Sequence, residues 1–225
     1  MMNKLWVFGD SYSVPFSKIG SNDSWRRDYI IWKQYTPKCY GEVVSENLNL
    51  KHVNSAIGAA DNYTILDSII DVMYSISSDD IIIIGWSNTL RFRVANTNKN
   101  FTTIQPNNTT TAGVINYVKE LSNTTLTELL INRDNSVYID ELNNYIKLLN
   151  FLFKKNKIIH WSPFGQDKDG LLTTCNSLNG LELIVKETNG EVNDTHFSEN
   201  AHHQLTKHFL DILNNYKYPL YKKYV

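Results

Sequence analysis

The segment Asp80–Gly85 constrains the fold of this chain more than any other, because it contains four consecutive isoleucines. A strand that is apolar at every position has both faces buried, which is typical of a parallel strand inside an α/β sheet. Similar short apolar runs, bounded by polar residues or glycine, occur at Lys4–Phe8 and Lys157–Trp161. The sequence therefore predicts buried parallel strands at these three places.

Weaker apolar runs at Lys51–Ala56 and Leu181–Val185 are candidates for a second and a fifth strand. Between the strands, apolar residues recur every three or four positions, which is the period of an amphipathic helix. This pattern predicts helices at Tyr40–Leu48, Asn62–Ile76 and Ser136–Phe153, and a last helix that starts at Ser198, a good N-cap residue. Strands that alternate with helices predict one domain, residues 1–225, with a three-layer α/β/α sandwich and a mostly parallel five-stranded sheet.

Composition and charge exclude several classes of function. A net charge of −1 gives no electrostatic reason to expect nucleic acid or an anionic membrane as a partner. We expect the basic residues near the chain ends, Arg26 and Arg27 among them, to lie on the solvated surface. The longest apolar run, Ile81–Trp86, is far too short to span a bilayer. The first expected strand leaves no room for a secretory signal, which favours a cytoplasmic or virion-associated protein.

The stretch Ala95–Ala112 interrupts the alternation, because it is polar and rich in Asn and Thr, without clear periodicity. It follows the four-isoleucine strand directly, and loops at that edge of a sheet often carry ligand contacts. Two interpretations stay open, a surface excursion and a lid over a substrate.

The first strand ends at Gly9, and a serine, Ser11, follows two residues later. Side chains just after a parallel strand lie at the carboxyl edge of the sheet, where open α/β sheets bind their ligands. A serine there is a candidate nucleophile if a histidine from another loop reaches it.

The best candidates for the base and its partner are His196 and Asp194, in a polar loop before the last helix. They are two residues apart, so in an extended segment both side chains project to the same side. A carboxylate so close can fix the tautomer of the imidazole and stabilise its charged form. Among the other histidines, His160 ends a strand and competes for this role, and no spacing among them predicts a metal site.

Donors for an oxyanion are expected in two further turns. The turn 54–62 follows a candidate strand, and its small residues Gly58 and Ala59 let backbone N–H groups approach a ligand closely. The turn after the four-isoleucine strand contributes the side-chain amide of Asn88 at the same edge.

These four segments, in this order, resemble the blocks of the SGNH (GDSL-type) hydrolase family over most of the chain. The matching residues are Gly9-Asp10-Ser11-Tyr12-Ser13 for the first block, Gly58-Ala59 for the second, Gly85-x-Ser-Asn88 for the third and Asp194-Thr-His196 for the last. Three departures are visible. The usual Asp-x-x-His spacing would place Asn193 at the acid position, alanine stands at residue 59 where the family's glycine aligns best, and Thr89 replaces a common Asp.

The resemblance implies a serine esterase on a flavodoxin-like sheet that needs no metal or organic cofactor. Ser11 is then the nucleophile, His196 the base, and Asp194 the acid that orients His196. Ser11, Gly58, Ala59 and Asn88 form the oxyanion hole. The implied substrate is a small-molecule or glycan ester with a short acyl group such as acetyl. Two alternatives stay open, an O-acyltransferase of the same fold and a non-catalytic binding or structural module, for example one associated with a virion.

Aromatic residues beside the strand ends also have two interpretations. Tyr12, Trp86, Trp161 and Phe164 are expected either to line an acyl or sugar site or to belong to the core.

Overall fold

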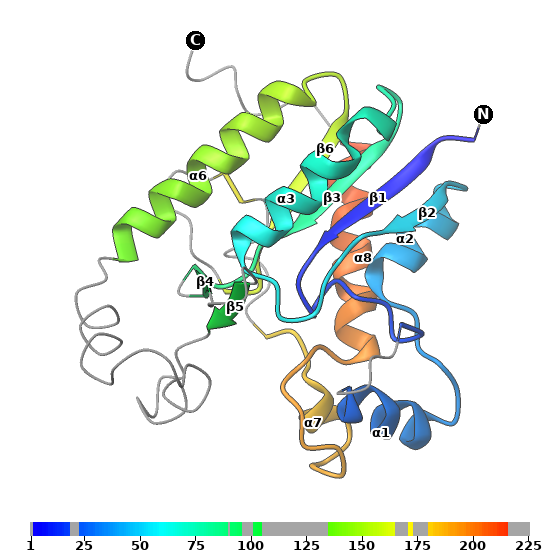
Figure 1. Ribbon diagram of the computed structural model, residues 1–225. Coiled ribbons are helices and arrows are strands. Elements are labelled where there is room, and N and C mark those ends of the chain that lie inside the picture. The colour runs from blue at the N-terminus through cyan, green and yellow to red at the C-terminus, as the bar shows by residue number, and fades with distance from the viewer. Residues whose placement is uncertain are drawn as a thin grey trace, which may run out of the picture.

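The computed structural model describes residues 2–18, 23–89, 91–95, 101–104, 135–164, 171–172 and 180–215 (Figure 1). Within them, an open parallel sheet has the strand order β2-β1-β3-β6. Its strands are β1 (Lys4–Gly9), β2 (Lys51–Asn54), β3 (Ile81–Gly85) and β6 (Lys157–Trp161). The predicted α/β fold with a parallel sheet is confirmed, and each of these strands lies within two residues of its predicted bounds.

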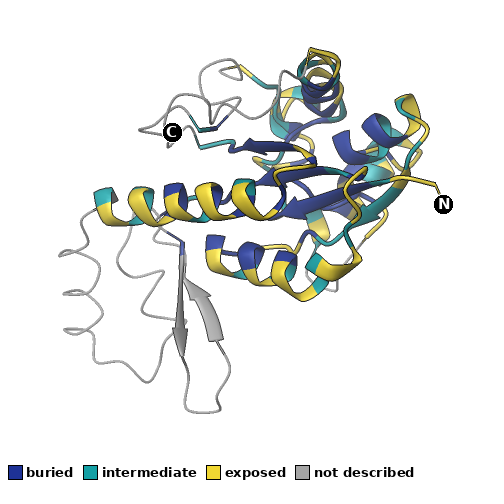
Figure 2. Cartoon of the chain, turned by 90° about the horizontal axis from the view of Figure 1, so that it is seen from above, coloured by how far each residue is buried: buried dark blue, intermediate teal, exposed yellow. Residues whose placement is uncertain are grey.

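Helices pack on both faces of this sheet (Figure 1). One face carries α3 (Asn62–Val72), which continues as the short 3-10 helix η1 (Met73–Ser75), and α6 (Asn135–Leu152). The other face carries α2 (Tyr40–Asn47) and α8 (Glu199–Asn214). Figure 2 shows buried residues on the sheet and on the inner sides of these helices. Two further helices, α1 (Ser24–Lys33) and α7 (Ile184–Glu187), lie together beyond the carboxyl ends of the strands (Figure 1).

The prediction of a fifth strand at Leu181–Val185 is wrong. Leu183 makes an isolated antiparallel bridge with Phe197, and α7 begins at the next residue. The physical reason is that Ile184 buries its side chain in a small cluster with Phe16 and Tyr29, which are distant in sequence, instead of in the sheet. A short apolar run does not distinguish these two uses.

The polar stretch Ala95–Ala112 contains part of an antiparallel hairpin, which the sequence did not predict. Strand β4 (Phe92–Ala95) pairs with β5 (Phe101–Ile104). The remainder of this stretch lies outside the described residues. Its two interpretations, a surface excursion and a lid over a substrate, therefore stay predictions.

The strand register aligns the ends of β1, β3 and β6. Gly9 pairs with Gly85, and Gly85 pairs with Trp161. The segments that leave β1 and β3 therefore start at one level of the same sheet edge, and the segment after β2 is tied to them because Ile57 donates its N–H to the Gly9 carbonyl at 2.9 Å.

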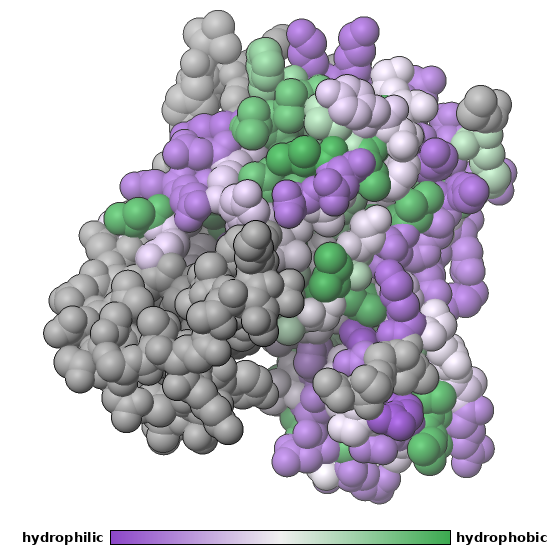
Figure 3. All heavy atoms as spheres, in the orientation of Figure 1, coloured by the Kyte–Doolittle hydropathy of each residue, from purple (hydrophilic) through white to green (hydrophobic). Residues whose placement is uncertain are grey.

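The surface over α3 and α6 mixes apolar side chains with polar ones (Figure 3). Its exposed apolar residues include Ile70 on α3 and Phe151 on α6. No helix in the described part of the chain is both long enough and apolar enough to cross a membrane.

Candidate active site

The turn after β1 requires glycine at residue 9. Gly9 has φ +151°, a conformation that L side chains rarely adopt, and an added Cβ would lie 2.8 Å from the Gly85 carbonyl oxygen. Ser13 closes the turn by donating its N–H to the Asp10 carbonyl at 2.9 Å. This turn presents Ser11 as a half-buried residue at the sheet edge.

His196 and Asp194 lie in the loop between α7 and α8. The backbone N–H of Ile184 donates to the carbonyl of His196 and that of Val185 donates to the carbonyl of Asp194, so the first turn of α7 holds this loop. Ser198 ends it as the predicted N-cap of α8, since its side chain accepts the Ala201 N–H.

The fold brings together the three residues that the sequence singled out for acid–base chemistry. The imidazole Nε2 of His196 lies 2.9 Å from Ser11 Oγ, although 185 positions separate these residues. Its Nδ1 lies 2.6 Å from Asp194 Oδ1. Both distances are within hydrogen-bond range, and together they join a serine, an imidazole and a carboxylate in the order that can activate a hydroxyl group as a nucleophile. Asn193, the position that the usual family spacing favours, is exposed.

Asp10 is part of the scaffold of this turn. Its side chain is 1% exposed, and Oδ1 accepts the Tyr12 N–H at 3.1 Å. Arg91 Nη1 lies 3.3 Å from the other carboxylate oxygen and donates to the Ala60 carbonyl at 2.9 Å. Burial raises the pKa of Asp10 above its ordinary value, and Arg91 opposes that shift. Arg91 thus connects the turn that carries Ser11 with the turn that carries Gly58 and Ala59, and nothing in the sequence singled it out.

The predicted oxyanion donors lie in the segments that follow β2 and β3, at the sheet edge where β1 ends before Ser11. Gly58 and Ala59 are exposed in a turn that Ala60 closes by donating its N–H to the Ile57 carbonyl at 3.2 Å. Ala59 has φ +61°, which non-glycine residues rarely adopt. Residue 59 therefore occupies a backbone position that favours glycine.

Asn88 is half-buried in the segment after β3. Two hydrogen bonds hold this segment against the start of α3. The Asn62 amide donates to the Ser87 carbonyl at 3.2 Å and accepts the Ser87 N–H at 2.8 Å. The candidate donors thus belong to segments that hydrogen bonds tie together at the sheet edge.

Helix α1 brings two residues to the site that the sequence analysis missed. The indole of Trp25 stacks on the imidazole of His196, with centroids 4.0 Å apart and planes at 4°. Arg26 is buried, which corrects its predicted surface position, and it pairs with Asp23 at 2.5 Å. It also reaches the Ser11 carbonyl at 3.4 Å. The spacing of Trp25, Tyr29 and Trp32 was the helical signal available in the sequence.

The competing histidine His160, the nearby His202 and two of the four aromatic candidates belong to the core. Burial lowers the pKa of both His160 and His202 to about 3, so these imidazoles are neutral. Trp86 and Trp161 are fully buried. Tyr12, in contrast, packs against the His196 ring at 5.0 Å. Phe164 in turn meets Tyr12 edge-on at 5.7 Å, so these two aromatic residues flank the site.

No group of three or more potential metal ligands occurs among the described residues. No model of a known protein family matches the chain, and no curated protein matches it.

Proposed function

We propose that the protein is a serine esterase of the SGNH type that removes a short acyl group, such as acetyl, from a glycan or a small ester. The observation that carries this proposal is the contact of His196 Nε2 with Ser11 Oγ at 2.9 Å, with Asp194 on the opposite nitrogen. A buried structural serine has no need of a histidine that is itself oriented by a carboxylate.

In the proposed reaction, Ser11 Oγ attacks the ester carbonyl carbon while His196 Nε2 takes the hydroxyl proton. His196 then gives that proton to the alcohol oxygen as the carbon–oxygen bond of the ester breaks, which leaves an acyl-serine. A water molecule attacks the acyl carbon, loses a proton to His196, and the acid leaves as Ser11 Oγ regains that proton. Asp194 stabilises the imidazolium that forms in each half of the reaction.

The oxyanion of each tetrahedral intermediate would accept hydrogen bonds from the Ser11 N–H, the N–H of Gly58 or Ala59, and the Asn88 amide. The positive φ of Ala59 supports its alignment with the glycine of the family's second block. A backbone donor needs no particular side chain, so alanine at this position is compatible with the role.

The test is the hydrolysis of a short-chain aryl ester by the wild type, Ser11→Ala and Ser17→Ala. Ser17 is an exposed serine close by in sequence and serves as the matched control. We expect Ser11→Ala to lower kcat/KM by roughly a thousandfold or more, with the same unfolding midpoint, and Ser17→Ala to behave as the wild type. Turnover that survives in Ser11→Ala would contradict the proposal.

Labelling by a fluorophosphonate separates the enzyme from a non-catalytic module. Only an activated serine reacts readily with this reagent, so the wild type should be labelled at Ser11 and Asp194→Asn far more slowly. A wild type that neither turns over esters nor is labelled at Ser11 would favour the binding or structural module instead. Transfer of the acyl group to an added sugar hydroxyl in place of water would identify an acyltransferase.

A further inference from the structure

The indole of Trp25 covers one face of the imidazole that bridges Ser11 and Asp194. The two rings are parallel within 4° and their centroids are 4.0 Å apart, which is the separation of stacked rings in van der Waals contact. The guanidinium carbon of Arg26 lies 4.5 Å from the centroid of the same indole. The half-buried Trp25 thus packs against both His196 and Arg26, and the face that meets His196 is not open to a ligand.

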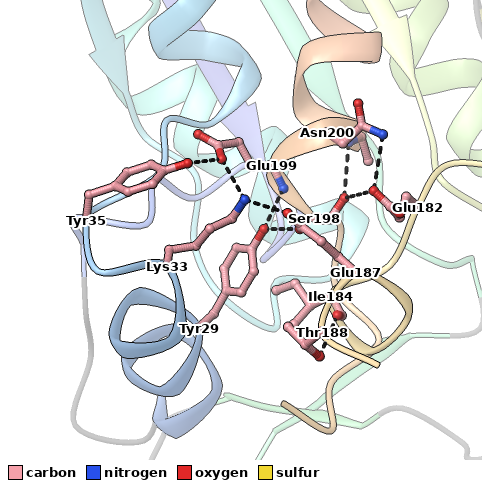
Figure 4. A network of polar contacts seen from close by, with 11 residues as sticks. Tyr29, Lys33, Tyr35, Glu182, Ile184, Glu187, Thr188, Ser198, Glu199 and Asn200 are labelled. Carbon is pink, nitrogen blue, oxygen red and sulfur yellow. Dashed lines mark hydrogen bonds and ion pairs between the residues drawn. The ribbon is translucent and has the colours of Figure 1, made fainter. Parts of the chain in front are cut away.

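Helix α1 is tied to the segment that carries His196 (Figure 4). Lys33 forms ion pairs with Glu187 at 2.5 Å and with Glu199 at 2.9 Å. The hydroxyl of Tyr29 donates to the Glu187 carboxylate and accepts the Glu199 N–H. Glu187 ends α7 and Glu199 begins α8, so these contacts attach α1 to both ends of the loop that contains Asp194 and His196.

None of these contacts involves Ser11, Asp194 or His196. They therefore hold Trp25 near the loop independently of these three residues. The side chains of Lys33 and its two carboxylate partners are partly buried, 15–16% exposed each. The Glu199 contacts lower the pKa of that carboxyl despite its partial burial, so it is ionised at neutral pH. The stack is therefore held by packing, charge and backbone hydrogen bonds at once.

We propose that Trp25 is a positioning residue, whose indole face holds the His196 ring in the plane that directs Nε2 at Ser11 and Nδ1 at Asp194. The kinetic part of this inference rests on the proposed function. In the acyl-serine intermediate, His196 Nε2 has no hydrogen bond to Ser11 Oγ. The imidazole ring is then oriented by its contact with Asp194 and by its stacking on Trp25. The imidazolium formed during the reaction is also attracted to the face of an indole. The contact is therefore stronger in the transition state than in the resting enzyme, which is the condition for an effect on kcat.

The test compares Trp25→Leu, Trp25→Phe and Trp32→Leu with the wild type. Phenylalanine keeps an aromatic face toward His196, whereas leucine does not. Trp32 lies on the same helix and contacts Tyr29 and Lys33 with its ring, and its replacement leaves their ion pairs and hydrogen bonds to Glu187 and Glu199 in place, so it controls for weakened packing of α1. We expect Trp25→Leu to lower kcat for a short-chain aryl ester by roughly tenfold with KM changed less than twofold. Trp25→Phe should restore most of kcat, and Trp32→Leu should stay close to the wild type.

A second readout needs no turnover. In the Ser11→Ala background with labelled histidine, the ring protons of His196 should be shifted upfield by the indole ring current. The Nδ1 proton shared with Asp194 should give a downfield signal in slow exchange with water. Both features should be lost or broadened in Trp25→Leu and retained in Trp32→Leu.

The outcomes separate this inference from the proposed function. Absence of all esterase activity and labelling in the wild type would remove the proposed function, and the positioning of the ring would still be decided by the histidine signals. Unchanged histidine signals in Trp25→Leu, or an increase in KM alone, would overturn the positioning role. An increase in KM alone would indicate substrate contact by Trp25 instead.

Discussion

The buried pair of Asp10 and Arg91 gives a prediction that does not depend on any activity. The two side chains are 1% and 7% exposed, and Nη1 of the arginine lies 3.3 Å from Oδ2 of the aspartate. Burial is the largest cause that raises the pKa of Asp10, and Arg91 is the largest that lowers it. The substitution Arg91→Met keeps a long apolar side chain but removes the charge, and so leaves the carboxylate in the core without its guanidinium partner.

Removal of one partner from a buried ion pair costs about 3–5 kcal/mol. Here the cost must depend on pH, because Asp10 can take up a proton instead of staying charged. A carboxyl with a raised pKa in the folded state holds a proton that the unfolded chain has already lost. Stability therefore falls as pH rises from the unfolded value near 3.8 and levels off above the folded pKa. Without Arg91 the folded pKa of Asp10 is higher still, so the fall continues to higher pH.

Urea unfolding at pH 5 and pH 8 tests this reasoning. We expect Arg91→Met to lose about 3 kcal/mol at pH 8 and clearly less at pH 5. The double variant Asp10→Asn/Arg91→Met should recover much of the loss at pH 8, because it buries no charge. The reasoning would be refuted if Arg91→Met lost the same stability at both pH values, or if the double variant were no more stable than Arg91→Met. Either result would show that Arg91 stabilises the fold by some means other than its ion pair with Asp10.

Three further predictions concern other parts of the structure. Burial lowers the pKa values of His160 and His202 to about 3, so the unfolded chain takes up protons on these residues before the folded protein does. Each should therefore cost about 1 kcal/mol of stability per pH unit as pH falls from 6.5 toward 3. Replacing either by a neutral residue should flatten the pH dependence of urea unfolding in that window. Asp194→Asn should lower kcat for an aryl ester by two to four orders of magnitude while the unfolding midpoint changes little, since the imidazole keeps its position but loses its charged partner. Gly85→Ala should destabilise the fold by about 1–3 kcal/mol in thermal unfolding, because the new Cβ would lie 2.5 Å from the Ser13 hydroxyl oxygen.

The parallel sheet and most of its helices could be predicted because their signals are local. The isoleucine run of β3 has no amphipathic alternation, so it indicates burial on both faces, and the structure buries Ile82, Ile83 and Ile84 completely. Leu181–Val185 gave a weaker and ambiguous signal, because Glu182 interrupts its apolar residues and so short a run fits either a strand or a buried turn of helix. Ile184 found partners on α1 and in the turn after β1, which are contacts that no local pattern encodes.

Helix α1 was missed for a different reason. Its apolar residues, two tryptophans, a tyrosine and two isoleucines, stand among charged residues, and its role became visible only through long-range contacts. Lys33 meets Glu187, which is 154 positions away, and Trp25 meets His196. The charged residues that made the segment look like surface are the ones that attach it, so composition pointed the wrong way. Arg26 illustrates this most clearly, because it is 2% exposed and was expected in solvent.

The Asp-x-His spacing in the last loop shows why much of the candidate site was still readable from the sequence. Asp194 Oδ1 accepts the backbone N–H of His196 at 2.7 Å and lies 2.6 Å from Nδ1 of the same residue. This is an Asx-type turn, in which a carboxylate is positioned by the backbone two residues ahead. The acid and the base therefore form one local unit, because the contact that places the carboxylate beside Nδ1 spans only two residues. The long-range contact between His196 Nε2 and Ser11 completes the arrangement, and it forms because glycine ends β1 at the same sheet edge that the loop before α8 reaches.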